Sequence, residues 1–366
     1  MAKSRLHELA ARGQSIWFDT LSRQLVDSGE LKRMMDEDAV TGVTSNPTIF
    51  QKALTGSDLY DDDIKRLLGE TDDASTIFFS LALDDIRAAC DVLRPAYDAT
   101  DGADGYVSME VEPGIAYDTG KTFDQVQWIS TEVERPNLMI KIPATEPGLP
   151  AIEDSIAHGT SINITLIFSL PRYKAVVEAY LRGLERLVAG GGNPARVASV
   201  ASFFVSRVDT EADKRLAGHD DLKGKLAIAN AKLAYQHYLE TFAGPRWEYL
   251  AGKGATKQRC LWASTSTKNP AYRDVMYVEE LVGPETINTM PLETIEAFQD
   301  HGEVRGDTVL EGIDEAESLL KALAEAGVDY TDVVDTLEAE GVQKFADSFA
   351  EILDGIHAKR ASLAAA

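Results

Sequence analysis

Cysteine is scarce in this chain of 366 residues, and the two that occur, Cys90 and Cys260, lie far apart in the sequence. Two separated thiols form neither a disulfide framework nor a closely spaced metal-ligand pair, so we expect a chain suited to a reducing cytosol. None of the six histidines forms an HExxH pattern or a neighbouring ligand pair. The sequence therefore predicts no metal site.

Long apolar runs and an excess of basic residues are absent as well. No run approaches the roughly 18–20 apolar residues of a membrane span, and residues 1–8 lack the apolar core of a signal peptide. Asp and Glu number 60 against 36 Lys and Arg, a formal net charge of −24. This charge argues against nucleic acid and anionic membranes as partners. We expect a soluble, cytoplasmic protein in which any phosphorylated substrate needs locally gathered basic groups.

Nucleotide-binding motifs are also missing. No GxGxxG pattern follows a predicted strand, there is no Walker A loop, and the glycines at 190–192 are more typical of a turn than of a phosphate cradle. We therefore expect no nucleotide cofactor, and the sequence predicts no cofactor of any other kind.

Strand and helix patterns alternate along the whole chain. Predicted strands lie at 15–20, 40–47, 105–113, 137–145, 161–169, 197–204, 259–265 and 286–291. Predicted helices lie at 3–12, 22–37 (with a possible break at Gly29), from Pro47, and at 58–68, 75–93, 122–133, 149–158, 172–187, 222–241, 292–299, 311–325 and 331–359. Eight such units favour an α/β fold of the (β/α)8 TIM-barrel type with additional helices.

Length alone fits either two average domains or one enlarged barrel. No Gly-Ser or Pro-rich linker divides the chain. We therefore expect one domain spanning residues 1–366, with an N-terminal lead-in helix and a C-terminal helical extension.

The fourth predicted strand carries a cation within an apolar sequence. Leu138, Ile140 and Ile142 share one face, Lys141 lies on the other, and Pro143 places the lysine near the carboxyl end of the strand. Burying an ammonium is costly unless it has a partner or a chemical role. In a (β/α)8 barrel this end of the strands carries the active site. A structural lysine paired with a buried carboxylate is the alternative.

Polar residues recur near the carboxyl ends of several predicted strands whose other face is apolar. They are Asp19, Asn46, Glu110, Lys141, Asn163, Thr165, Ser202 and Ser264. In a barrel the apolar faces meet the helices, so these polar groups would converge at the mouth. The alternative is a set of unrelated capping and pairing roles, and Asn46 in particular stands where the N-cap of a helix belongs.

A lysine among carboxylates and amides, without a metal, suits Schiff-base formation with a ketone. An amine with the ordinary pKa of about 10.4 is less than about 0.1% neutral at pH 7, so we expect burial to lower the pKa of Lys141 to roughly 7–8. A carboxylate in direct contact would stabilise the ammonium instead. We therefore expect Glu110 to act through a water held by Thr165, without a direct salt bridge to Lys141.

Several short motifs occur in order along nearly the whole chain. They are Ser15-Ile-Trp-Phe-Asp19, Thr44-Ser-Asn-Pro-Thr48, Val107-Ser-Met-Glu-Val-Glu112, Met139-Ile-Lys-Ile-Pro143, Ile162-Asn-Ile-Thr-Leu-Ile-Phe-Ser169, Ser202-Phe-Phe-Val-Ser-Arg207 and Ser264-Thr-Ser-Thr-Lys-Asn-Pro270. Together they resemble the transaldolase family, in its longer bacterial and plant-type branch.

The resemblance implies a class I mechanism without metal or organic cofactor. Lys141 would attack the ketone of a sugar phosphate such as sedoheptulose 7-phosphate or fructose 6-phosphate. Asp19 would take the proton from the C4 hydroxyl as the C3–C4 bond breaks. Glu110 and Thr165, with a water, would serve formation and dehydration of the carbinolamine. The retained three-carbon unit would pass to an aldose phosphate.

The resemblance also implies binding roles. Asn46 and Asn163 would hold hydroxyls of the dihydroxyacetone unit. Ser202, Arg207 and Lys268 match phosphate-binding positions, with the arginine acting as a fork and the lysine as a point charge. Many relatives carry arginine at the Lys268 position. An ion pair on a helix surface is the alternative for Arg207.

Two further residues bear on the outcome of the reaction. Relatives that only cleave fructose 6-phosphate tend to carry tyrosine at the position of Phe204, so phenylalanine favours transfer. Core packing is the alternative for Phe204, and barrel packing is the alternative to substrate contact for Ser264. Two competing functions stay open: a Schiff-base aldolase that releases dihydroxyacetone, and a non-catalytic sugar-phosphate-binding barrel. A monomer and a homodimer are both compatible with the sequence.

Overall fold

The computed structural model describes residues 4–55 and 57–364, and its centre is a closed barrel of eight parallel strands in sequence order. Every strand pairs with the next along the chain, and the last pairs with the first. The strands are β1 (Gln14–Phe18), β2 (Val40–Thr44), β3 (Val107–Glu110), β4 (Leu138–Pro143), β5 (Ile162–Ile167), β6 (Ser199–Phe204), β7 (Arg259–Ala263) and β8 (Thr286–Met290). The predicted (β/α)8 barrel is confirmed.

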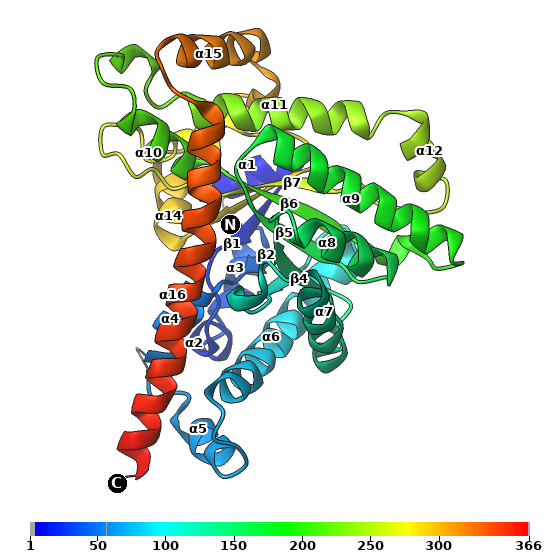
Figure 1. Ribbon diagram of the computed structural model, residues 1–366, viewed down its shortest axis with the longest axis vertical. Helices are drawn as coiled ribbons and strands as arrows, with labels where there is room; N and C mark the ends of the chain where they lie inside the picture. Colours follow the sequence, from blue (N-terminus) through cyan, green and yellow to red (C-terminus); the bar gives the residue numbers. More distant parts are fainter. Residues whose placement is uncertain (1–3, 56, 365–366) are drawn as a thin grey trace.

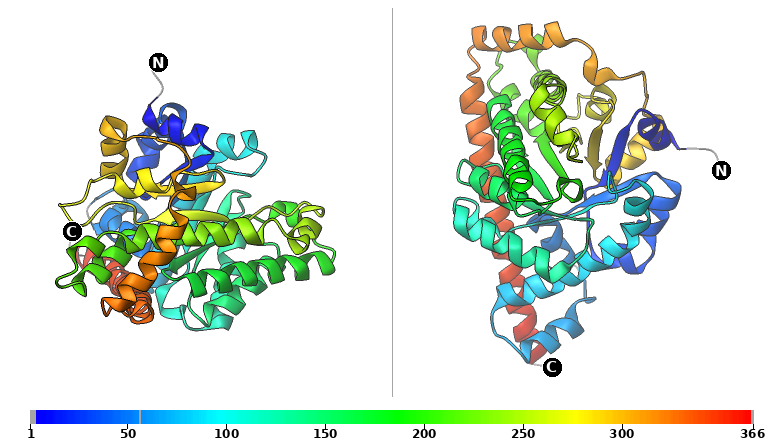
Figure 2. Two further views of the ribbon diagram at one scale, coloured as in Figure 1. Left: turned by 90° about the horizontal axis from the view of Figure 1, so that it is seen from above. Right: turned by 90° about the vertical axis from the view of Figure 1, so that its right-hand side faces the viewer.

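Helices surround the strands, as the views in Figures 1 and 2 show. They are α1 (Arg5–Ala11), α2 (Arg23–Asp27), α3 (Glu30–Glu37), α4 (Pro47–Thr55), α5 (Asp61–Leu68), α6 (Ala74–Ala99), α7 (Thr119–Val133), α8 (Gly148–Ala157), α9 (Leu170–Ala189), α10 (Ser206–Lys214), α11 (Leu226–Thr241), α12 (Pro245–Ala251), α13 (Met276–Glu280), α14 (Leu292–His301), α15 (Ile313–Glu325) and α16 (Tyr330–Ala364). Single 3-10 turns lie at Pro113–Ile115, Pro194–Arg196, Asp220–Leu222 and Thr308–Leu310.

Local sequence signals explain several helix boundaries. The Ser169 side chain accepts a hydrogen bond from the backbone N–H of Arg172, which caps α9 as the sequence predicts. The possible break at Gly29 is real, because Gly29 adopts a φ of +77° between α2 and α3. The lead-in helix is present as α1, although Lys3 of the predicted 3–12 segment lies outside the described residues.

Three short helices, α10, α12 and α13, are absent from the prediction. Each has nine residues or fewer, so the apolar positions repeat too few times to establish a helical period. The first of the three follows β6 directly and carries Arg207.

The strand register brings the predicted site residues level with one another. Glu110 of β3 is paired with Lys141 of β4, and Lys141 is paired with Asn163 of β5. Residues opposite one another in neighbouring parallel strands lie on the same face of the sheet. These three side chains therefore share the inner face of the barrel.

The last helix, α16, extends the barrel in a way that matters for the site. Figure 1 shows it running from beside α15 to beside α5, and it also contacts α4, α6, α10 and β5. Gly341 is the point of close approach, because a Cβ there would lie 3.0 Å from Cδ2 of Leu166 in β5. Glycine at this position lets the helix lie directly on the carboxyl end of the barrel.

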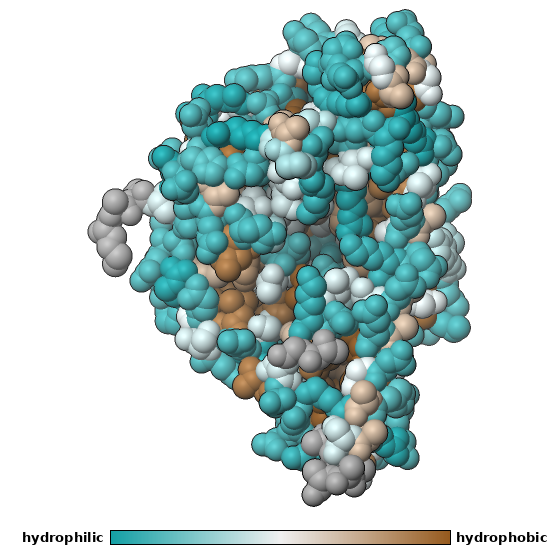
Figure 3. All heavy atoms as spheres, turned by 90° about the vertical axis from the view of Figure 1, so that its left-hand side faces the viewer, coloured by the Kyte–Doolittle hydropathy of each residue, from teal (hydrophilic) through white to brown (hydrophobic). Residues whose placement is uncertain are grey.

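The described part of the chain contains no helix long and apolar enough to cross a membrane. Hydrophilic side chains cover most of the face drawn in Figure 3. Cys90 and Cys260 are buried and unbonded to each other, as their separation in the sequence predicts.

Candidate active site

Lys141 lies inside the barrel and contacts a carboxylate directly. Its Nζ is 3.3 Å from Oε2 of Glu110, and the two side chains are only 6% and 3% exposed. The same ammonium donates a hydrogen bond to the backbone carbonyl of Ser45, at 3.2 Å. The prediction that Glu110 would make no direct salt bridge with Lys141 is therefore wrong.

The register of β3 and β4 is the physical reason for this contact. Glu110 and Lys141 are directly paired across the two strands, which sets their side chains side by side on the inner face. The sequence pattern assigns each residue to a face of its own strand but leaves the relative shift of two strands undetermined.

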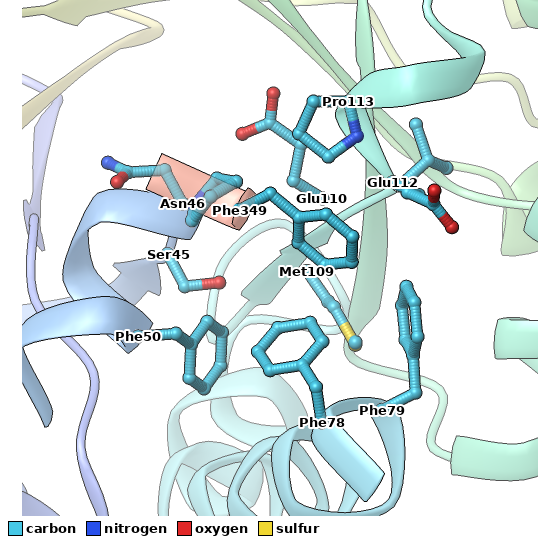
Figure 4. Close-up of a pocket in the computed structure, with 12 residues that line it drawn as sticks. Ser45, Asn46, Phe50, Phe78, Phe79, Met109, Glu110, Glu112, Pro113 and Phe349 are labelled. Carbon is cyan, nitrogen blue, oxygen red and sulfur yellow. The ribbon is translucent and has the colours of Figure 1, made fainter. Parts of the chain in front are cut away.

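Met109 and Glu110 are neighbours on β3 whose side chains point to different sides. Figure 4 shows the rings of Phe50, Phe78 and Phe79 gathered around Met109, with the Glu110 carboxylate directed away from them. Burial raises the pKa of the Glu110 carboxyl, although the Lys141 ammonium acts in the opposite direction. A carboxylate with a raised pKa is a better proton acceptor for the neighbouring ammonium.

Asp19 is the second buried carboxylate of the site. Burial raises its pKa, whereas the charge of Lys141 and a hydrogen bond from Thr44 lower it. Oγ1 of Thr44 lies 3.0 Å from Oδ1 of Asp19 and 2.8 Å from Oγ1 of Thr289. Side chains from β2 and β8 thus hold the carboxylate that follows β1.

Two buried oxygen atoms of the site, Oε1 of Glu110 and Oγ1 of Thr165, have no hydrogen-bond partner among the described residues, and Oε2 of Glu110 has only its ion pair with Lys141. Buried polar atoms are nearly always paired in folded proteins, so the first two are available to a substrate or a water. The residue after Thr165, Leu166, has a φ of +59° at an irregularity in the pairing of β5 with β6. Such backbone strain is often found at functional sites.

A cavity of about 580 Å³ opens above Lys141 at the carboxyl ends of the strands. Most of the residues that the sequence analysis singles out line it. They are Asp19, Asn46, Lys141, Thr165, Ser202, Phe204, Arg207, Ser264 and Lys268. The convergence expected from the barrel geometry is therefore present for these residues.

Asn163 and Glu110 are not part of this lining. The amide of Asn163 is fully buried, donates to Oγ of Ser108 at 3.0 Å and accepts from Oγ of Ser202 at 2.7 Å. The structure thus places Asn163 beneath Ser202, as its hydrogen-bond support. Asn46 lines the cavity and also caps α4, since its Oδ1 accepts from the backbone N–H of Ile49 at 3.1 Å.

Phe204 and Arg207 meet on one side of the cavity. The guanidinium lies over the phenyl ring, 5.0 Å from its centroid, and the ring also packs against Phe168 at 5.1 Å. Burial lowers the pKa of Arg207, and it has no hydrogen bond or ion pair within the described part of the chain. The alternative of a surface ion pair is therefore not seen, and Arg207 lines the cavity with its N–H donors unpaired among the described residues.

Ser264 and Lys268 follow β7 on the same side. Ser264 has a φ of +56°, and its Oγ lies 3.0 Å from Oγ of Ser206. Nζ of Lys268 donates to Oγ of Ser266 at 2.6 Å. Both the packing role and the substrate role of Ser264 remain compatible with this position.

Sequence reasoning missed several other residues of the lining. They are Thr44, Lys52, Thr289, Glu293, Lys344 and Phe345. Lys52 lies about one and a half turns into α4, the helix that Asn46 caps. Its closeness in sequence to Asn46 could have indicated that it reaches the cavity. The last two come from α16, and nothing in their local sequence indicates that this helix reaches the barrel mouth.

The cavity is basic although the chain is acidic. Its lining includes five cations, namely Lys52, Lys141, Arg207, Lys268 and Lys344, and two carboxylates, Asp19 and Glu293. The formal charge of the whole chain is −24. The locally gathered basic groups that the sequence analysis requires for a phosphorylated substrate are therefore present.

Comparison with known proteins agrees with this geometry. A family model described as Transaldolase/Fructose-6-phosphate aldolase matches residues 16–356. A transaldolase of Parafrankia sp. (strain EAN1pec) is 50% identical over 364 residues, which cover 98% of this chain and 99% of the relative. The transaldolase of Acidothermus cellulolyticus is 52% identical over 351 residues, covering 95% and 94%, and Transaldolase 1 of Streptomyces avermitilis is 51% identical over 358 residues, covering 96% and 94%. The chain belongs to the transaldolase/fructose-6-phosphate aldolase family.

Proposed function

We propose that this protein is a transaldolase of the non-oxidative pentose phosphate pathway. It transfers a dihydroxyacetone unit from a ketose phosphate, sedoheptulose 7-phosphate or fructose 6-phosphate, to an aldose phosphate, glyceraldehyde 3-phosphate or erythrose 4-phosphate. The observation that carries the proposal is a buried amine 3.3 Å from a carboxylate, at the floor of a cavity lined with further cations.

Imine formation uses the ion pair as a proton relay. Glu110 takes a proton from the Lys141 ammonium, and the neutral amine attacks the C2 carbonyl of the ketose. A proton moves from nitrogen to oxygen, which gives the carbinolamine. Glu110 then returns its proton to the hydroxyl, which leaves as water and yields the iminium. Thr165 holds the water that serves these transfers.

Bond cleavage uses the second carboxylate. Asp19 removes the proton of the C4 hydroxyl, the C3–C4 bond breaks, and its electron pair flows into the iminium to give an enamine. The aldose phosphate leaves as an aldehyde. The enamine then attacks the carbonyl carbon of the acceptor, Asp19 returns its proton to the new hydroxyl, and water releases the product ketose from Lys141.

The remaining residues bind the substrate. Asn46 holds a hydroxyl of the dihydroxyacetone unit, and Asn163 acts indirectly, by holding the hydroxyl of Ser202 in place. Ser202, Arg207 and Lys268 bind the phosphate, with Ser264 beside them. Phe204 lies under Arg207, and phenylalanine at this position favours transfer over simple cleavage.

The substrates are small sugar phosphates, and the mechanism needs no metal or organic cofactor. We place the enzyme in the cytoplasm, as one domain over residues 1–366, acting as a monomer or homodimer without nucleic-acid or membrane partners.

Reductive trapping tests the mechanism. Borohydride added with fructose 6-phosphate should leave a covalent three-carbon or six-carbon adduct on Lys141, which peptide mass spectrometry locates. Absence of an adduct would leave only a sugar-phosphate-binding barrel. A coupled assay with and without erythrose 4-phosphate separates transfer from cleavage. Free dihydroxyacetone as the main product would identify an aldolase.

A further inference from the structure

The helix α16 carries two lysines and one arginine, and they differ in their partners. Lys359 is paired with Asp61 and donates to the backbone carbonyl of Ser57 at 2.8 Å. Arg360 lies 2.6 Å from Asp72. Lys344, in contrast, has no hydrogen bond or ion pair with any residue that the structure describes, and it lines the large cavity. A lysine that lines a cavity without a protein partner is available to an anionic ligand.

Packing holds this part of α16 over the barrel mouth. Gly341, one turn before Lys344, lies against Leu166 of β5, where a Cβ would come within 3.0 Å of Cδ2. Phe345, which directly follows Lys344, has the centroid of its ring 5.9 Å from Nζ of Lys141. The position of Lys344 therefore follows from contacts on both sides of it along the helix.

Lys344 is one of four cations that four separate segments bring together. Burial lowers its pKa, and repulsion from Arg207, Lys268 and Lys52 lowers it further. The carboxylates Asp19 and Glu293 also line the cavity, and Glu340 precedes Lys344 by one turn of α16. None of these carboxylates makes an ion pair with Lys344 within the described residues. Like charges held together in this way favour the binding of an anion.

We infer that Lys344 binds the phosphate group of the substrate together with Arg207 and Lys268. This inference rests on the proposed function for the identity of the substrate. It assigns a direct role in substrate binding to the C-terminal helix, which lies outside the eight strand–helix units of the barrel. A phosphate monoester carries close to two negative charges at neutral pH and offers three acceptor oxygens, which suits a group of several cations.

The test compares Lys344→Met with Lys359→Met, which removes the same charge from the same helix at a partly buried ion pair outside the cavity lining. Lys344→Met should raise the KM for fructose 6-phosphate about tenfold, but the KM for unphosphorylated fructose by less than twofold. The inhibition constant of inorganic phosphate should rise by the same factor as the KM for fructose 6-phosphate. Lys359→Met should leave all three values within twofold of those of the unmodified enzyme. Lys344→Arg, which keeps the charge, should restore most of the affinity for phosphate.

Calorimetric titration with inorganic phosphate keeps this test independent of turnover. If the unmodified protein transfers no dihydroxyacetone but binds phosphate more tightly than Lys344→Met does, the proposed function fails and the anion site stands. If Lys344→Met binds phosphate and fructose 6-phosphate as tightly as the unmodified enzyme, the inference is wrong whatever the activity. Circular dichroism checks that each variant is folded, and Lys344→Gln replaces the methionine variant if that one is not.

Discussion

Two arginines at opposite ends of the barrel differ in their hydrogen-bond partners. Arg259 begins β7 and donates to Oγ of Ser15 at 2.6 Å and to the carbonyls of Thr286 and Ala103 at 2.7 and 3.2 Å. Arg207 follows β6 at the carboxyl end and contacts an aromatic ring without any protein acceptor among the described residues. Both side chains are partly buried.

This difference in partners indicates a structural role for the guanidinium of Arg259 and a ligand-binding role for that of Arg207. The acceptors of Arg259 belong to β1, β8 and the segment before β3, so this guanidinium joins strands that lie far apart in the sequence. A guanidinium without protein acceptors adds little to stability and keeps its donors for a ligand. The amino end of the barrel thus maintains the fold, whereas the carboxyl end holds groups in readiness for substrate.

The largest expected effect is that of Lys141→Ala, at the carboxyl end. Transfer should fall by about a thousandfold or more, because no other described residue can replace the imine-forming amine. The melting temperature should fall, because the variant leaves the Glu110 carboxyl buried without its counter-ion. Steady-state assay and thermal unfolding measure the two properties. Full transfer activity in Lys141→Ala would exclude the Schiff-base mechanism.

At the other end, Arg259→Ala should lower the free energy of unfolding by about 3 kcal/mol, because it leaves several polar acceptors near the barrel floor unpaired. Urea unfolding followed by circular dichroism measures this. Lys257→Ala is the control from the same segment, since it removes a half-exposed pair with Glu285 and a contact with the ring of Tyr238. Equal losses for the two variants would contradict the structural role of Arg259.

A smaller effect on free energy is expected for Arg207→Ala. The KM for phosphorylated substrates should rise roughly 10- to 100-fold, through loss of charge-assisted hydrogen bonds. Stability should change by less than about 1 kcal/mol, because no protein partner is left unpaired. Arg215→Ala, at the C-terminal end of the same helix α10, is the control and should leave KM unchanged. An unaltered KM for Arg207→Ala would reassign the phosphate site.

The smallest expected effect concerns the pH dependence of kcat/KM. In the proposed mechanism Asp19 works as a carboxylate, and burial raises its pKa. Thr44→Val removes a hydrogen bond that favours the ionised form, so the pKa rises further and protonation inactivates the enzyme at a higher pH. The acid limb of the profile should move up by about half a pH unit to one. Thr41→Val, three residues earlier on β2, contacts Asp104 instead and should leave the limb in place.

The sequence predicts the barrel well because strand and helix periods are local properties. The inner face of each strand follows from alternation, which is why Lys141, Asp19 and Thr165 could be assigned to one cavity. The Glu110 contact could not be predicted, because it depends on the register between two strands. Lys344 and Phe345 could not be found either, since their position depends on where a helix packs in three dimensions. The alternation also says nothing of Asn163 lying beneath Ser202.

The order in which a ribosome makes these parts has a consequence for activity. Residues 330–364 of α16 are synthesised after all eight strands. A nascent chain that has already closed its barrel still lacks the aromatic ring near Lys141 and the cation beside Arg207. The cavity that binds the substrate is therefore complete only after this last helix has been translated and has packed against the barrel.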